Sequence, residues 1–237
     1  MHIHILETGA PPAPLDEEHP NYPTMFERLL AASSEHFSFS SSAIFRGEIP
    51  PSVASFDALL VTGSADGVYE GHDWIAPAEE LIRAAAAAKR PQIGVCFGHQ
   101  LMAQAFGGRV EKSDKGWGVG VHDYAVRSLA AWMTPPQGRI ACAVSHQDQV
   151  IDLPDGARVL AGSDFCPNGV ITYAQGPAIS LQPHPEFSHD YAEALMRLRR
   201  GRIPEPLVDA GLSSLKGKSD RSLIGQWMAN FYLTHTR

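Results

Sequence analysis

The chain has 237 residues, of which 44% are hydrophobic and 19% charged, and its formal net charge is −7 at pH 7. This length and composition fit one larger globular domain, or one domain with a small appendage, and exclude a largely disordered chain. The negative charge and the scattered lysines and arginines argue against a nucleic-acid partner. No apolar stretch is long enough to span a membrane, so a cytoplasmic location is expected.

Short apolar runs alternate with segments of helical period through the first half of the chain. Strands are expected at residues 3–6, 58–62 and 92–95. Helices are expected after them, with one apolar face from Met25 to Leu30, one in the alanine-rich segment 78–89, and one from Leu101 to Phe106. This alternation is typical of an α/β fold with a mostly parallel sheet.

The pattern changes in the second half of the chain. Strand-like segments at residues 118–126, 139–145 and 158–162 follow one another without convincing helices between them. They predict a small antiparallel excursion beside the main sheet. Residues 169–173 and 178–182 then indicate a return to the main sheet.

The C-terminal segment is predicted to be helical. A helix is expected near residues 191–199, followed by a link with Pro and Gly and by an apolar helical face that ends at Tyr232. We therefore predict a main domain over residues 1–190 and a helical extension over 191–237 that packs on the same domain. The apolar face could instead form a homodimer.

Cys96 lies at the junction between an expected strand and the helix that follows it. The segment Gly94-Val95-Cys96-Phe97-Gly98 has the form of a nucleophile elbow, in which a sharp turn strains the central residue and projects its side chain. The glycines leave room where strand and helix approach closely. The helix N-terminus stabilises a thiolate and offers the Phe97 N–H to a developing oxyanion. A lone cysteine is more often a buried apolar side chain, but this context favours a nucleophile.

The segment 182–186, Gln-Pro-His-Pro-Glu, directly follows the apolar run 178–181. In an extended backbone, residues two apart point to the same face, so His184 and Glu186 are predicted to project together toward one site. His184 would take the thiol proton and later protonate the leaving amine, while Glu186 would fix the imidazole tautomer. A solvated pair in a proline-rich loop is the alternative, which the presence of the elbow disfavours.

The glycine-rich turn after the expected strand 58–62 is a third candidate part of the site. Gly63 could place a backbone N–H, free of side-chain crowding, as a second oxyanion donor. A simple strand-ending turn explains the same residues, and taken alone it is the better interpretation.

The motifs Gly-Val-Cys-Phe-Gly-His-Gln at 94–100 and Gln-Pro-His-Pro-Glu-Phe at 182–187 together resemble those of the class I (triad) glutamine amidotransferases. Thr-Gly-Ser at 62–64, followed by Trp74-Ile75, is similar to the stand-alone, GMP-synthase-like branch of that family. The resemblance runs from about residue 3 to residue 187, so residues 1–190 would be the amidotransferase domain. It implies a flavodoxin-like three-layer α/β fold with a mostly parallel central sheet.

The resemblance also implies roles for individual residues. Cys96 would be the nucleophile, His184 the base and Glu186 its support. Further candidates would lie near the glutamyl part of the substrate, and these are Gln100, Ser64 and the backbone around Ser145-His146-Gln147. Ser64 stands where many relatives have a second glycine, so the oxyanion loop departs from the family's pattern.

The reaction that the resemblance implies is hydrolysis of a γ-glutamyl amide, most simply glutamine to glutamate plus ammonia, through a cysteine thioester and without a cofactor. Nothing after Phe187 resembles an ammonia-using synthetase, and no ATP-binding Gly-rich loop is present. The chain would therefore serve a separate synthetase partner or hydrolyse its own substrate. One alternative is a γ-glutamyl peptidase acting on glutathione-type conjugates. Another, motivated by Ser64, is a weakly active regulatory protein that a partner completes.

The other cysteines and histidines indicate no further chemistry. Cys96, Cys142 and Cys166 are too widely spaced for a disulfide framework or a paired-cysteine metal site. Cys142 lies in an apolar run and is expected in the core, whereas Cys166, in a loop with Pro and Gly, could be exposed. His2 and His4 have no carboxylate or cysteine at ligand spacing, so no metal site is predicted.

Overall fold

The computed structural model describes residues 1–235. Its strands are β1 (His2–Glu7), β2 (Ser38–Ala43), β3 (Ala58–Val61), β4 (Gln92–Val95), β5 (Arg109–Lys112), β6 (Gly118–Val126), β7 (Arg139–His146), β8 (Asp148–Asp152), β9 (Arg158–Gly162), β10 (Val170–Thr172) and β11 (Ala178–Leu181). Its helices are α1 (Leu15–Glu18), α2 (Tyr22–Ala31), α3 (Ile75–Ala87), α4 (Phe97–Ala105), α5 (His189–Leu198), α6 (Glu205–Ser214) and α7 (Arg221–Thr234). None of the helices in this part of the chain is long and apolar enough to cross a membrane.

A nine-stranded sheet with the order β2-β1-β3-β4-β11-β10-β9-β6-β7 forms the centre of the fold. The first five strands in this order pair in parallel, and the later pairs are antiparallel. β5 and β8 form a separate two-stranded antiparallel sheet. The predicted α/β class with an antiparallel excursion is therefore confirmed, although most of the excursion continues the central sheet instead of lying beside it.

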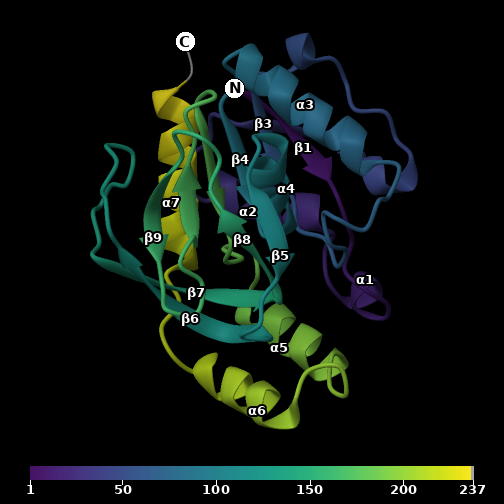
Figure 1. The fold of residues 1–237 in the computed structure, drawn as a ribbon, viewed down its shortest axis with the longest axis vertical. Helices are drawn as coiled ribbons and strands as arrows, with labels where there is room; N and C mark the ends of the chain where they lie inside the picture. The colour runs from purple at the N-terminus through teal and green to yellow at the C-terminus, as the bar shows by residue number, and fades with distance from the viewer. Residues whose placement is uncertain (236–237) are drawn as a thin grey trace.

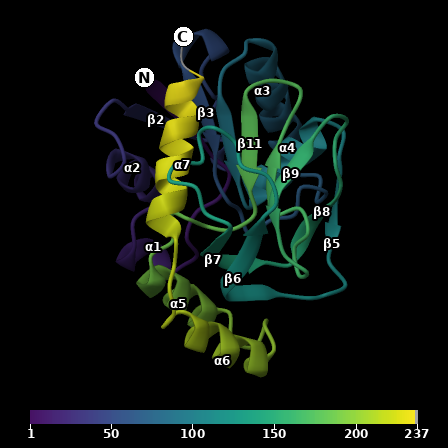
Figure 2. The ribbon, with the colours of Figure 1, turned by 90° about the vertical axis from the view of Figure 1, so that its left-hand side faces the viewer.

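Helices cover both faces of the parallel part of the sheet, which gives three layers (Figures 1 and 2). Side chains alternate between the faces along each strand, so Ile3 and Ile5 of β1 pack with α2 and α7, whereas Leu6 packs with α3 and α4. In β3, Leu60 and Leu59 divide between the same two clusters. Because both faces are buried, these strands appear in the sequence as continuous apolar runs.

The C-terminal helix α7 returns to the parallel part of the sheet, while α5 and α6 lie at the end of the molecule beside β6 and β7 (Figure 1). The apolar face of α7 is buried in the same cluster as β1, and the Tyr232 hydroxyl donates to the Leu59 carbonyl over 2.8 Å. The apolar face of α7 therefore belongs to the hydrophobic core. The last two residues of the predicted extension 191–237 lie outside the described residues, and a domain boundary at residue 190 stays a prediction.

Candidate active site

Cys96 lies in the sharp turn between β4 and α4, at the carboxyl edge of the parallel strands. Its φ of 52° and ψ of −103° place a non-glycine residue in a backbone region that side chains disfavour. The residue is 4% exposed. Phe97 is the first residue of α4, so its N–H has no acceptor within the helix. The structure thus contains the strained strand-to-helix turn that the sequence predicts.

The two glycines of the elbow lie where the backbone leaves no room for a side chain. A Cβ atom on Gly94 would lie 2.3 Å from the Gly98 carbonyl oxygen, and one on Gly98 would lie 2.3 Å from the Val61 carbonyl oxygen. The Gly98 N–H also donates to the Thr62 carbonyl over 2.9 Å. The elbow is therefore locked against both β4 and the end of β3.

Gly98→Ala is expected to lower the free energy of unfolding by at least about 2 kcal/mol, since the added methyl group overlaps a backbone carbonyl that cannot move independently. Urea unfolding followed by circular dichroism measures this loss. Gly138→Ala is the matched control, because no heavy atom lies within 4 Å of the added Cβ. Equal stability of the two variants would contradict the close approach of α4 and β3.

His184 and Glu186 meet just beyond the end of β11, where His184 Nδ1 lies 2.7 Å from Glu186 Oε1. The residues are 4% and 2% exposed. The prediction that an extended strand delivers the pair is wrong in its geometry. β11 ends at Leu181, and a turn that Phe187 closes by donating its N–H to the His184 carbonyl (3.3 Å) brings the side chains together.

The charges around His184 favour its protonated form. Burial alone would lower the pKa of His184, but its electrostatic interactions with Cys96 and Glu186 and its hydrogen bonds to both outweigh burial and raise the pKa to about 10. Phe187 stacks on the imidazole with ring centroids 3.9 Å apart and planes 6° apart. The site therefore favours an imidazolium at His184.

Gly63 lies directly against the cysteine and the histidine. A Cβ on Gly63 would lie 3.1 Å from His184 Cε1 and 3.7 Å from Cys96 Cβ, so a larger residue would press on both side chains. The neighbouring Ser64 hydroxyl accepts the Asp66 N–H over 3.2 Å, which closes a tight turn after β3. The expected third element therefore lies beside the first two.

A cavity opens above Cys96 and brings together the four residues that the resemblance proposed as substrate contacts, Ser64, Gln100, Ser145 and His146. His146 is buried and its Nδ1 bonds the Asp148 carbonyl over 3.0 Å. Burial lowers the pKa of His146 to about 3, so this imidazole is neutral. Trp117 also lines the cavity.

Gln182 belongs to the His–Glu motif, but its residue type alone predicted no role for it. Its amide nitrogen lies 3.6 Å from Cys96 Sγ, and its amide oxygen accepts from Gln100 over 3.2 Å. The Gln100 nitrogen also donates to the Asp148 carbonyl over 3.0 Å. The side-chain amides of Gln182 and Gln100 thus connect the thiol to the cavity wall. This arrangement depends on the position of Gln182, directly after β11.

Charged residues of both signs line the cavity, and no sequence motif predicted them. Arg199, just after α5, donates to the Ser145 hydroxyl over 2.7 Å, and its guanidinium lies 5.6 Å from the Trp117 ring centroid. The other charged lining residues are Lys112, Asp66, Glu70 and Asp148. They come from separate segments, so only the folded chain brings them together.

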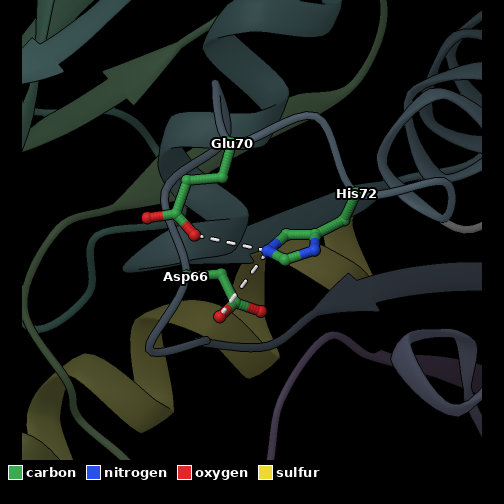
Figure 3. A group of neighbouring side chains, drawn as sticks. All are labelled: Asp66, Glu70 and His72. Atoms are coloured by element: carbon green, nitrogen blue, oxygen red, sulfur yellow. Dashed lines mark hydrogen bonds and ion pairs between the residues drawn. The ribbon is translucent and has the colours of Figure 1, made fainter.

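Asp66 and Glu70, which line the cavity, form a group with the neighbouring His72 (Figure 3). His72 Nε2 lies 3.3 Å from Glu70 Oε2 and 3.9 Å from Asp66 Oδ1. Their ligand atoms lie within 4.8 Å of one another, so these residues could hold a divalent cation. All three are at least partly exposed, and the contacts are equally those of ordinary ion pairs.

Cys142 and Cys166 are buried apart from the cavity lining. Cys142 lies in the core as predicted. Cys166 is also buried, which corrects the expectation that its loop could expose it. Burial raises the pKa of both thiols, to about 12 for Cys166, which disfavours their thiolate forms.

A parallel sheet with a strained cysteine elbow and a buried His–Glu pair at its carboxyl edge defines an α/β protein of the amidotransferase class. The family model described as glutamine amidotransferase class-I matches residues 27–198, and the chain belongs to this family of enzymes.

Individual relatives agree with the family assignment. The chain is 24% identical to gamma-glutamyl peptidase 4 of Arabidopsis thaliana, over 89% of this chain and 86% of that protein. It is 31% identical to a glutamine-hydrolyzing GMP synthase subunit of Methanocaldococcus jannaschii, over 63% of this chain and 80% of that protein. A glutamine amidotransferase structure from Thermotoga maritima covers 98% of each chain with a TM-score of 0.80 at 17% identity, which shows the same fold.

Proposed function

We propose that this protein hydrolyses a γ-glutamyl amide, most simply glutamine, through a thioester on Cys96. The observation that carries the proposal is the elbow at Cys96 with the buried His184–Glu186 pair beside it. A nucleophile, a base and a group that orients the base are the parts that acyl transfer requires. Membership of an amidotransferase family supports the same chemistry.

The reaction begins with attack of the Cys96 thiolate on the γ-carbonyl carbon. The tetrahedral oxyanion forms beside the Phe97 N–H and the backbone N–H at Gly63, and two such donors contribute about 3–6 kcal/mol of transition-state stabilisation. The His184 imidazolium protonates the leaving amine, which departs and leaves a γ-glutamyl thioester. His184 then takes a proton from water, the hydroxide attacks the thioester, and glutamate leaves as the thiolate is restored. These steps need no cofactor.

A γ-glutamyl peptidase is the second candidate, and the charged cavity favours it. The cavity contains two cations, Arg199 and Lys112, beside its three carboxylates, and two cations match a substrate whose leaving amine carries a second carboxylate. The name of the Arabidopsis relative points the same way. A glutaminase would instead pass its ammonia to a separate synthetase partner, as the name of the archaeal relative suggests.

A substrate panel tests the proposed function. Purified protein is incubated with glutamine, with a γ-glutamyl dipeptide and with the α-linked isomer of that dipeptide, and released glutamate is measured. We expect release from γ-linked compounds alone, because attack at the γ-carbon requires the α-amino and α-carboxylate groups at one end of the cavity. A higher kcat/KM for the dipeptide would favour the peptidase, and failure to cleave any γ-linked compound would contradict both candidates.

Arg199→Ala is expected to raise KM for a γ-glutamyl substrate about 10- to 100-fold, the effect of losing a charged hydrogen bond to a carboxylate. Steady-state kinetics with the preferred substrate of the panel measures this. Arg197→Ala is the matched control, since Arg197 lies nearby on α5, is exposed and pairs with Glu193 outside the cavity. Equal KM values for the two variants would remove Arg199 from the binding site.

A further inference from the structure

Arg221 connects the C-terminal helix to the turn that carries the His–Glu pair. It is the first residue of α7, and its guanidinium donates from Nε to the Pro185 carbonyl (3.1 Å) and from Nη2 to the Glu186 carbonyl (3.2 Å). Both acceptors are main-chain oxygens of the turn itself. One planar side chain therefore fixes two successive peptide groups.

The start of α7 is in turn hydrogen-bonded to β7, the strand that also accepts a hydrogen bond from His184. The Asp220 N–H donates to the Ala141 carbonyl over 2.7 Å, and the Ala141 N–H donates to Asp220 Oδ2 over 2.9 Å. Two residues further along the strand, the Ala143 carbonyl accepts the His184 N–H over 2.8 Å. Arg221 and His184 are thus held in register by the same strand.

The side-chain contacts of Glu186 do not fix its position by themselves. Oε1 contacts His184, whereas the buried Oε2 has no hydrogen-bond partner among residues 1–235. A carboxylate with a single side-chain bond depends on its backbone for alignment. A shift of about 1 Å in a catalytic group can cost on the order of 100-fold in rate.

We infer that Arg221 is a positioning residue, which holds the turn 184–187 so that Glu186 stays aligned on His184 and couples the C-terminal helix to the active site. This inference rests on the proposed function of the His184–Glu186 pair. Arg221 touches neither the thiol nor the cavity above it, so its effect reaches the reaction only through the pair.

Loss of the two Arg221 hydrogen bonds should have a distinct kinetic signature. Arg221→Gln is expected to lower kcat about 10- to 100-fold with KM nearly unchanged, because the substrate cavity does not contain Arg221. The ionisable groups facing His184 are Cys96 from the elbow, Glu186 from its own turn and His146 from β7, of which His146 is neutral. A Glu186 carboxylate that is less well aligned on His184 stabilises the imidazolium less. The alkaline limb of the pH–rate profile should therefore move to lower pH.

The experiment compares Arg221→Gln, Arg221→Lys and Arg28→Gln with the unaltered chain. Arg28 lines a second cavity, which Glu186 and Arg221 also line, but it makes no side-chain hydrogen bond within the described residues. Arg28→Gln should therefore keep kcat and the pH–rate profile unchanged. Arg221→Lys retains the charge but has a single donor nitrogen in place of the planar fork, so its kcat should fall between those of the unaltered chain and Arg221→Gln. The pH dependence of Cys96 alkylation by iodoacetamide, followed by mass spectrometry, reports the same ion pair without substrate.

The outcomes separate this inference from the proposed function. Wild-type kcat and an unshifted alkylation profile in folded Arg221→Gln would overturn the inference, and if that variant does not fold, the same result in Arg221→Lys would overturn it. Absence of γ-glutamyl hydrolysis by the unaltered chain would instead overturn the proposed function. The alkylation profiles would still decide whether Arg221 positions the pair.

Discussion

Cys96→Ser is expected to lower kcat/KM for a γ-glutamyl amide by at least about 10⁴-fold, because it removes the proposed covalent nucleophile and with it most of the catalysis that such a triad provides. Serine nearly keeps the size of the side chain, but its hydroxyl is scarcely ionised and is a much weaker nucleophile than a thiolate. The strained backbone at φ 52° is unchanged by the substitution, so the elbow should fold normally. Steady-state glutamate release, with circular dichroism to verify folding, measures the effect.

Cys166→Ser is the matched control for the nucleophile. Cys166 is as deeply buried as Cys96 but lies outside the cavity lining, so its replacement should cost some stability and leave kcat/KM close to that of the unaltered chain. Hydrolysis by Cys96→Ser at the unaltered rate would exclude a thioester on Cys96. Activity lost equally in both variants would indicate damage to the fold instead of to the reaction.

Strands buried on both faces or in long antiparallel pairs could be predicted from the sequence, with bounds correct to about one residue. β4, β6 and β9 have the predicted limits, because their apolar or alternating runs reflect burial directly. β2 was missed, since Ser38–Ala43 consists largely of serine. Its serine hydroxyls bond the imidazoles of His2 and His4 on β1, a stabilisation that hydrophobic patterning does not record.

The elements at the rim and at the C-terminal end were missed for other reasons. β5 and β8 are short and partly exposed, and an ion pair between Arg109 and Asp152 links them. α6 lies in the segment that its Pro and Gly residues suggested was a link. A Cβ on Gly211 of α6 would lie 2.7 Å from Met196 Sδ and 3.4 Å from the Gly120 nitrogen of β6, so this glycine reflects close helix packing and not a break.

The site divides in the same way between local and tertiary features. The elbow could be predicted because strand, cysteine and helix are consecutive, and the structure supplies its positive φ at Cys96. Gln182, Arg199 and Arg221 could not, because each reaches the site only through the bend after β11 or through a later helix. The resemblance indicated which motifs meet, whereas the charges that surround them depend on the whole fold.

Glu186→Gln is expected to lower kcat about 10³- to 10⁴-fold, the cost usually seen when the carboxylate that orients a catalytic histidine becomes an amide. The change is isosteric and keeps the backbone carbonyl that Arg221 holds, so the turn should persist. The amide carries no charge, however, and can present its NH₂ group to the imidazole, which would favour the wrong tautomer. KM should change little, because Glu186 does not line the substrate cavity.

The pH dependence of Glu186→Gln follows from the same charge. In the unaltered chain, the pKa of His184 is raised, so the imidazolium persists at neutral pH and is lost only as pH rises through that raised value. Removing the Glu186 charge lowers the pKa of His184, so the alkaline limb of kcat/KM should move to lower pH while the acidic limb stays in place. Asp190→Asn removes a carboxylate from the second cavity, which Glu186 also lines, without touching His184. This variant should leave both limbs of the profile unchanged. An alkaline limb at the same pH in Glu186→Gln and in the unaltered chain would show that Glu186 does not sustain the imidazolium.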